Sequence, residues 1–302
     1  MYLRAISIGY AVPDGNFDAA VHSVFQSALN LRLNGENNLL TLLASGEGDL
    51  PQGMQLDTPE GFSFEEFQTG ELAVCKEDIL HFENSSLTVQ LSGARRWKCD
   101  LPALEFDPRD PAVSAAWSFV WEALNERQRL SEAEIIVEEL LRSNESARAG
   151  VPRKAGEAMR DLISAARRYD LDTSAVSALI GLGSGLTPSG DDLLVGYLAG
   201  RWCTVQGASE RAQFIASLGE TIIQLSSQTN DISRTYLYHA VQAQVSSRLA
   251  NLAETICRGE NPEPLSEIAE AAMRVGHTSG MDAVTGLLIG LVTWTRLEAS
   301  YF

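Results

Sequence analysis

The residues best suited to chemistry lie in one glycine-rich segment, residues 181–192, where four glycines within ten residues precede the adjacent carboxylates Asp191 and Asp192. Glycine tolerates positive φ and lets a ligand approach the backbone closely. The apolar run that follows predicts a helix, and a helix start carries unpaired N–H groups and a partial positive charge. We therefore expect a small polar ligand to bind where the glycines meet the helix.

The same pattern occurs a second time, because residues 185–200 align with residues 276–290 once one residue is omitted. Chance seldom duplicates so many special residue types in register, so we predict two related loop-to-helix junctions that face one shared pocket. The matched pairs are Gly185 and Gly276, Thr187 and Thr278, Ser189 and Ser279, Gly190 and Gly280, Asp192 and Asp282, Gly196 and Gly286, and Gly200 and Gly290.

A purely structural interpretation competes with the ligand site. Ser189 with Asp192, and Ser279 with Asp282, have the spacing of a capping box, which is worth about 1 kcal/mol of helix stability. The glycine pairs further along suit close packing of two helices. Capping does not account for Asp191 or for the glycines upstream of Thr187, so we favour the ligand site.

The residue types in the two loops restrict what the pocket could bind. Hydroxyl and N–H groups bind carbonyl or phosphate oxygens, whereas carboxylates accept hydrogen bonds from an NH₂ group or hold Mg²⁺. The carboxylates Asp191, Asp192 and Asp282 would together repel a bare anion. The substrate should therefore carry both donor and acceptor groups or bring a metal, and Mg²⁺ is the one cofactor that the residues could hold.

Three further polar residues have both a chemical and a structural interpretation. His277 is a titratable group beside a helix start and could be a general acid or base, or a solvent-facing loop histidine. Arg234 could bind carboxylate or phosphate with its forked guanidinium, or could cap a helix. His22 could reach the pocket from the N-terminal part of the chain, or could be structural there.

The overall composition limits the classes of partner. The 302 residues carry a formal net charge of −17, with 40 acidic and 23 basic residues, which disfavours nucleic acids and anionic membrane surfaces. The N-terminus lacks the layout of a signal peptide, and the most apolar segment, residues 283–295, is shorter than the ~20 residues that cross a bilayer. The four cysteines are widely scattered, which indicates reduced thiols. We expect a cytoplasmic protein.

The chain divides into a β-rich part, residues 1–106, and a helical part, residues 107–302, which is an α+β organisation with a barrel or sandwich first. Three prolines in residues 101–111 mark the change. Residues 14–28 could also be read as a helix. The predicted strands are residues 2–8, 21–25, 29–33, 39–43, 72–75, 79–82 and 87–91, and short apolar or alternating runs define them.

Helical periodicity begins around Trp117, Val120, Trp121 and Leu124. A second helix should open at Ser131 and run to about Ser143. The further predicted helices are residues 153–169, 173–180, 190–205, 209–227, 230–258, 265–275 and 280–297. Neither glycine-rich junction follows a convincing strand, which excludes a Rossmann or Walker context.

These motifs resemble those of the AllH-like family. The resemblance rests on a His-Ser-x-Phe at residues 22–25, the glycine-rich core at residues 181–192, a serine at position 233, and a Gly-His-x-Ser-Gly-x-Asp at residues 276–282. It covers essentially the whole chain. Ser184 stands where proline is commoner in the family.

The resemblance implies a subunit of oxamate carbamoyltransferase, which converts oxalurate and phosphate to oxamate and carbamoyl phosphate during allantoin breakdown in purine catabolism. It also implies FdrA-like and AllG-like protein partners. On this hypothesis the catalytic residues are His277, Asp192 and Asp282. The substrate-binding residues are Gly183, Gly185, Thr187, Ser189, Gly190, Asp191, Ser233, Arg234, Thr278, Ser279, Gly280 and His22, and a metal, if used, would be held by Asp191, Asp192 and Asp282.

Two other functions remain open at the level of sequence. The chain could be a non-catalytic subunit that binds a small ligand or acts as a scaffold, with the loops serving only to stabilise helices or contact partners. A small-molecule kinase is a weaker alternative, because residues 181–184 are similar to the glycine loop of galactokinase-like enzymes but lack its βαβ context.

Overall fold

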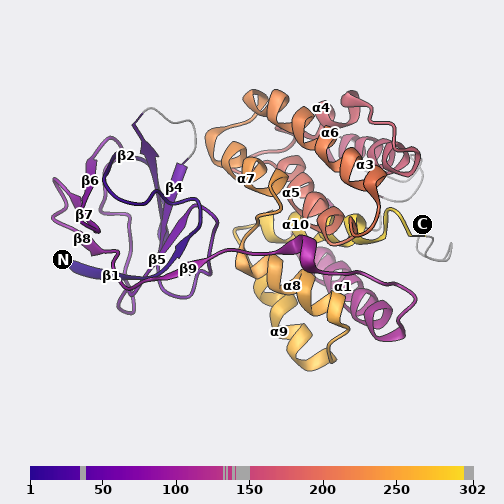
Figure 1. The fold of residues 1–302 in the computed structure, drawn as a ribbon, viewed down its shortest axis with the longest axis horizontal. Coiled ribbons are helices and arrows are strands. Elements are labelled where there is room, and N and C mark those ends of the chain that lie inside the picture. Colours follow the sequence, from indigo (N-terminus) through magenta and orange to yellow (C-terminus); the bar gives the residue numbers. More distant parts are fainter. Residues whose placement is uncertain (35–38, 132, 134, 138–139, 141–149, 296–302) are drawn as a thin grey trace. The chain divides into compact units, whose positions relative to one another are not determined.

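The structure is a computed structural model that describes residues 1–34, 39–131, 133, 135–137, 140 and 150–295. Contacts within the chain divide it into two compact units, one formed by Met1–Cys99 and the other starting at Asp100. The first unit is built from strands and the second from helices (Figure 1), which confirms the predicted α+β class.

The first unit is a β-barrel in which eight strands of the described residues follow the order β5-β4-β3-β2-β6-β7-β8-β1, and β1 closes the ring by pairing with β5. The ninth strand, β9, pairs in parallel with the end of β1. The strands are β1 (Tyr2–Gly9), β2 (Phe17–Val24), β3 (Ala28–Leu33), β4 (Leu39–Leu43), β5 (Gly53–Leu56), β6 (Leu72–Lys76), β7 (Ile79–Phe82), β8 (Thr88–Gln90) and β9 (Arg95–Trp97).

Alternation of side chains along each strand fills the barrel. In β1, Leu3 and Ala5 are buried while their neighbours face outward, as the period of two requires. All seven predicted strands are present, whereas β5 and β9 were not predicted. The helical alternative for residues 14–28 was wrong, because β2 occupies most of that segment.

The second unit is helical throughout its described residues, apart from loops (Figure 1). The predicted helix from Ser131 to about Ser143 lies largely outside the described residues. The elements are η1 (Leu101–Ala103), α1 (Pro111–Leu130), α3 (Val151–Arg168), α4 (Thr173–Leu179), α5 (Ser189–Trp202), α6 (Ser209–Leu225), η2 (Ser226–Gln228), α7 (Asp231–Val241), α8 (Ser247–Arg258), α9 (Pro262–Met273) and α10 (Ser279–Val292).

One predicted helix, residues 230–258, was wrong because the structure has two helices there. The α7 helix stops at Val241, and Ala243 adopts a left-handed conformation with φ of 61°. The side chain of Ser246 then accepts a hydrogen bond from the Leu249 N–H and caps the start of α8. No glycine or proline lies at this break, and the apolar periodicity continues across it, so the sequence predicted a single helix.

The α5 and α10 helices pack against each other at the centre of the helical unit, and their backbones come into close contact at the glycines. A Cβ added at Gly196 would collide with the backbone of Ala283 and Leu287, and one added at Gly286 would collide with that of Leu193 and Tyr197. The second set of partners is the repeat counterpart of the first. The two helices are therefore parallel and related by an approximate two-fold, and the close packing that the glycine spacing suggested is present.

Arg201 connects the C-terminal ends of the same two helices. It is fully buried, donates to the Gly290 carbonyl, and its guanidinium stacks 3.3 Å from the centre of the Trp294 ring. Burial lowers the pKa of Arg201 to about 9. The opposite, N-terminal ends of α5 and α10 are thus held side by side.

Among the described residues, no helix has both the length and the apolar character that crossing a membrane would require.

Candidate active site at two helix starts

The two glycine-rich junctions meet in the structure. Helix α5 begins at Ser189 and α10 begins at its repeat counterpart Ser279. The hydroxyl of Thr187, from the first loop, lies 2.5 Å from the hydroxyl of Ser279 in the second. Two positive helix ends therefore lie beside each other, joined by a hydroxyl pair that is partly exposed to solvent.

The predicted capping boxes were wrong. The N-cap residues are Pro188 and Thr278, and neither makes a side-chain capping hydrogen bond. Ser189 and Ser279 are instead the first helical residues, so their hydroxyls do not cap these helices. Ser279 uses its hydroxyl in the contact with Thr187. Helix capping was the structural alternative to ligand binding, and these two serines do not cap their helices.

Asp192 and Asp282 lie beneath the hydroxyl pair, with only 8% and 1% of their surfaces exposed. Burial raises the pKa of Asp192 well above its ordinary value, and the neighbouring Asp282 carboxylate raises it further, while the hydroxyls of Ser279 and Thr187 act in the opposite direction. The Oδ2 atom of Asp192 has no hydrogen-bond partner in the described part of the chain. Asp192 therefore keeps its proton to higher pH than an exposed aspartate.

Tyr236 of α7 also belongs to this cluster. Burial raises its pKa to about 12, and the charge of Asp192 contributes in the same direction. The phenol therefore keeps its proton and can donate a hydrogen bond. Sequence reasoning named Ser233 and Arg234 from the same helix but missed Tyr236.

Asp191 turns away from Asp192 and fixes the glycine-rich loop. Its carboxylate accepts from the Gly181 N–H at 2.9 Å and from the Thr229 hydroxyl at 2.5 Å. Burial raises the pKa of Asp191, and the hydrogen bonds from Thr229, Gly181 and Ser233 oppose that rise. Asp191 thus ties the loop to the start of α7. Thr229 was also missed by sequence reasoning.

The predicted glycines divide into two groups. Gly183 and Gly185 have φ of 120° and 89°. A Cβ at Gly183 would approach the Ser189 nitrogen at 2.8 Å, whereas one at Gly185 would meet nothing within 4 Å, so open space lies beside Gly185. Gly190 and Gly280 are buried, and an added Cβ would collide with the end of the preceding helix, at Leu179 in one case and at Ala272 and Met273 in the other. The second pair serves packing.

Three predicted residues have contacts of their own away from the carboxyl pair. His277 is exposed and lines a separate depression of about 540 Å³ with Met281 and residues of α1 and α9. Arg234 donates to the carbonyls of Ser226 and Thr229 and pairs with Asp231 at 2.9 Å, which is the capping alternative. His22 belongs to the barrel, where its Nδ1 lies 3.2 Å from the Ser23 hydroxyl.

The predicted trio of metal ligands does not come together. Among the described residues, no three side chains of His, Cys, Asp and Glu are grouped so that they could hold a metal ion. The reason is geometric, because Asp191 is turned toward Gly181 and Thr229 while Asp192 faces Asp282. The arrangement therefore offers hydrogen-bond donors and acceptors rather than a set of carboxylate ligands.

Comparison with known families agrees with both units. The family described as "AllH family N-terminal domain" matches residues 4–96, and the family described as "Oxamate carbamoyltransferase subunit AllH" matches residues 179–291. The second match spans both helix starts, the whole of α5, and all of α10 except its last residue, Val292. No solved structure matches the chain. On the matches to both of its units, the chain belongs to the AllH family.

Proposed function

We propose that the chain is a subunit of an oxamate carbamoyltransferase and that the paired helix starts bind the carbamoyl-bearing substrate. One observation carries the proposal: the Thr187–Ser279 hydroxyl contact joins the two loops directly above the Asp192–Asp282 pair. The family name supplies the reaction class. The geometry supports binding of a molecule that both donates and accepts hydrogen bonds.

The proposed reaction transfers a carbamoyl group between oxalurate and phosphate. A phosphate oxygen attacks the carbamoyl carbon of oxalurate, the bond from that carbon to the oxamate nitrogen breaks, and this nitrogen takes up one proton. The products are carbamoyl phosphate and oxamate. The site must therefore bind oxygen atoms, orient an NH₂ group and deliver a proton.

The raised pKa of Asp192 suits both the binding of substrate oxygen atoms and the delivery of a proton. Three ionised carboxylates would repel an anionic substrate, whereas a carboxyl that keeps its proton can donate to a carbonyl or phosphate oxygen. The partner Asp282 can then accept from the carbamoyl NH₂. The loop N–H groups and the hydroxyls of Thr187 and Ser279 supply further donors to oxygen.

Asp192 is accordingly our candidate for the proton donor, in place of His277. His277 is exposed and lines a depression formed with Met281 and residues of α1 and α9. We assign the chain to a complex of several proteins, because the family is described as a subunit. FdrA-like and AllG-like partners and a place in allantoin breakdown belong to the same proposal.

The test is turnover by the reconstituted complex that contains Asp192→Asn. We expect turnover to be abolished while the melting temperature stays within a few degrees. Asp170→Asn, which changes an exposed carboxylate outside the site, is the matched control and should leave turnover intact. Full turnover with Asp192→Asn would discard the role.

A non-catalytic subunit is the second candidate, and one observation favours it: Asp192 and Asp282 are almost completely buried. Such carboxyls could serve only to hold α5 against α10. In that case carbamoyl phosphate would not raise the melting temperature of the isolated chain, and the complex would lose assembly rather than turnover when Asp192 is changed.

A further inference from the structure

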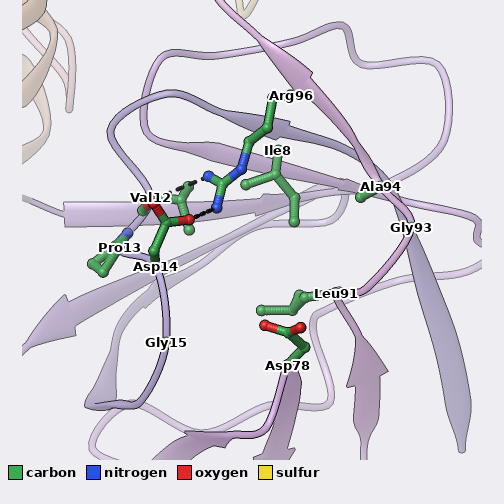
Figure 2. A pocket seen from close by; sticks show the side chains of 10 residues that line it. All are labelled: Ile8, Val12, Pro13, Asp14, Gly15, Asp78, Leu91, Gly93, Ala94 and Arg96. Carbon is green, nitrogen blue, oxygen red and sulfur yellow. Dashed lines mark hydrogen bonds and ion pairs between the residues drawn. The ribbon is translucent and has the colours of Figure 1, made fainter.

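A second polar cavity lies within the barrel unit, at one end of the barrel. It has a volume of about 230 Å³ and is formed by the loop after β1, the turn between β6 and β7, and the segment between β8 and β9. Figure 2 shows its lining residues, with Arg96 on one side and Asp78 on the other. Nothing in the proposed carbamoyl transfer uses this cavity.

The cavity has the composition of a ligand site. Its floor is apolar, because Ile8, Val12 and Leu91 are almost completely buried there. Three charged side chains line it: Arg96 and its ion-pair partner Asp14 lie on one side, and Asp78 lies on the other (Figure 2). Small-molecule sites typically combine an apolar lining with a few polar groups that fix orientation.

The guanidinium of Arg96 is held in place but keeps donors for a ligand. It donates to the carbonyls of Gly9 and Val12 at 3.4 and 3.3 Å and pairs with Asp14, as Figure 2 shows in part. These contacts use three of the five N–H groups of an arginine. The Asp14 side chain is 90% exposed, so water weakens its hold on Arg96.

Asp78 is positioned by a strained turn. Glu77 and Asp78 both have positive φ, 51° and 62°, which costs energy for residues other than glycine. Two contacts maintain the turn: the Leu91 N–H donates to the Asp78 carbonyl at 2.8 Å, and the Glu77 N–H donates to the Asn16 side chain at 3.2 Å. These contacts fix the backbone of Asp78 beside the cavity, and its side chain is exposed.

The Asp78 carboxylate acts electrostatically on a buried group of the barrel. Burial raises the pKa of the Cys75 thiol to about 11, and the nearby Asp78 carboxylate contributes to the rise. The neutral thiol cannot offset that charge. Asp78 itself is exposed, so its carboxylate is open to a hydrogen-bond donor from a ligand.

The geometry points to a binding site for a small carboxylate that also carries an N–H donor group. The carboxylate would lie against Arg96 and the N–H group, an amide or an ammonium, against Asp78. A cavity of about 230 Å³ is below the 300–1,000 Å³ of most ligand pockets, so the ligand has the size of an amino acid and not of a nucleotide. A dicarboxylate of the same size should be excluded, because its second charge would face Asp78.

The test is calorimetric titration of the full chain with succinamate, γ-aminobutyrate and succinate. Succinamate and succinate have nearly the same shape and differ in whether the second end donates or carries charge. We expect succinamate or γ-aminobutyrate to bind with a Kd at least about tenfold lower than that of succinate. Equal binding of all three, or no binding at millimolar concentration, would overturn the proposal.

Variants of Arg96 and Asp78 test whether the probe binds in this cavity. Arg96→Gln should weaken binding at least about tenfold, and Asp78→Asn should remove the discrimination between succinamate and succinate. Arg95→Gln and Glu77→Gln are matched controls, because Arg95 pairs with Asp49 instead and neither residue lines the cavity. Loss of binding in the controls would refute the assignment.

Asp192→Asn separates this site from the carbamoyl site. The barrel site requires binding of the probe to persist in that variant, whatever happens to turnover. Binding that disappears with Asp192→Asn and survives Asp78→Asn would place the probe in the helical unit and overturn the barrel site. Should Arg96→Gln fail to fold, the Asp78→Asn comparison decides alone.

Discussion

Replacing Asp192 with asparagine should change how the stability of the helical unit depends on pH. The substitution keeps the shape of the side chain and removes its ionisation. In the wild-type chain the pKa of Asp192 is raised by burial and by Asp282, so the folded state keeps a proton that the unfolded state has released. The two carboxyls titrate as a pair, and the variant removes one member.

The sign and the size of the effect follow from this linkage. The stability that the raised pKa contributes is complete below the unfolded value of about 3.9, and it is lost as pH rises through the folded pKa. Within that window each retained proton costs about 1.4 kcal/mol of unfolding free energy per pH unit. The wild-type chain should therefore lose stability relative to Asp192→Asn as pH rises above about 4.

Urea denaturation at several pH values measures the difference. Four of the five tryptophans, at positions 117, 121, 202 and 294, lie in the helical unit, so their fluorescence reports on it. We expect the wild-type minus variant difference to fall by up to about 1.4 kcal/mol per pH unit, whereas Asp170→Asn should track the wild type. A flat difference would refute the burial of Asp192 beside a second carboxyl.

Three further outcomes test other parts of the structure. Gly196→Ala should cost about 1–3 kcal/mol by urea denaturation, because the new methyl meets the Ala283 backbone; an unchanged midpoint would contradict the close helix contact. Glu71→Ala should cost about 2 kcal/mol in the barrel, since it strips the Ser85 N–H and hydroxyl of their acceptor; a melting curve equal to the wild type would argue against those bonds. Burial lowers the pKa of His239 to about 4, so the free energy of unfolding should fall by up to about 3 kcal/mol as pH drops from about 6.5 toward 4. His239→Gln should reduce that fall. If the wild type and the variant lose equal stability in acid, the buried His239 does not cause the loss.

The sequence predicted most of the fold because local periodicity and burial agree over most of the chain. Strands such as Ala28–Leu33 alternate, and helices such as α5 and α10 follow glycine-rich loops that mark their starts. The missed strand Gly53–Leu56 is too short to show a period, and Arg95–Trp97 carries two charges. These strands form because β1 offers them an edge, which is a tertiary effect.

The candidate site was predicted in part. The repeat correctly indicated that Thr187, Asp192, Ser279 and Asp282 would meet, because identical motifs in register imply equivalent positions. It did not show that His277 points elsewhere, since neighbours along a chain at a helix start face different directions. Tyr236 could not be found, because only the packing of α7 against α5 brings it to Asp192.

The reciprocal facing of Gly196 and Gly286 has a consequence for the symmetry of the paired helix starts. Each contact on one helix has its counterpart on the other, which is how two identical subunits meet across a molecular dyad. A shorter chain with one such helix would bring the same two helix starts together as a homodimer, with identical groups on both sides. Within one chain the two halves are free to differ, as they do where Asp191 of one corresponds to Met281 of the other, so the paired helix starts are not restricted to symmetrical ligands.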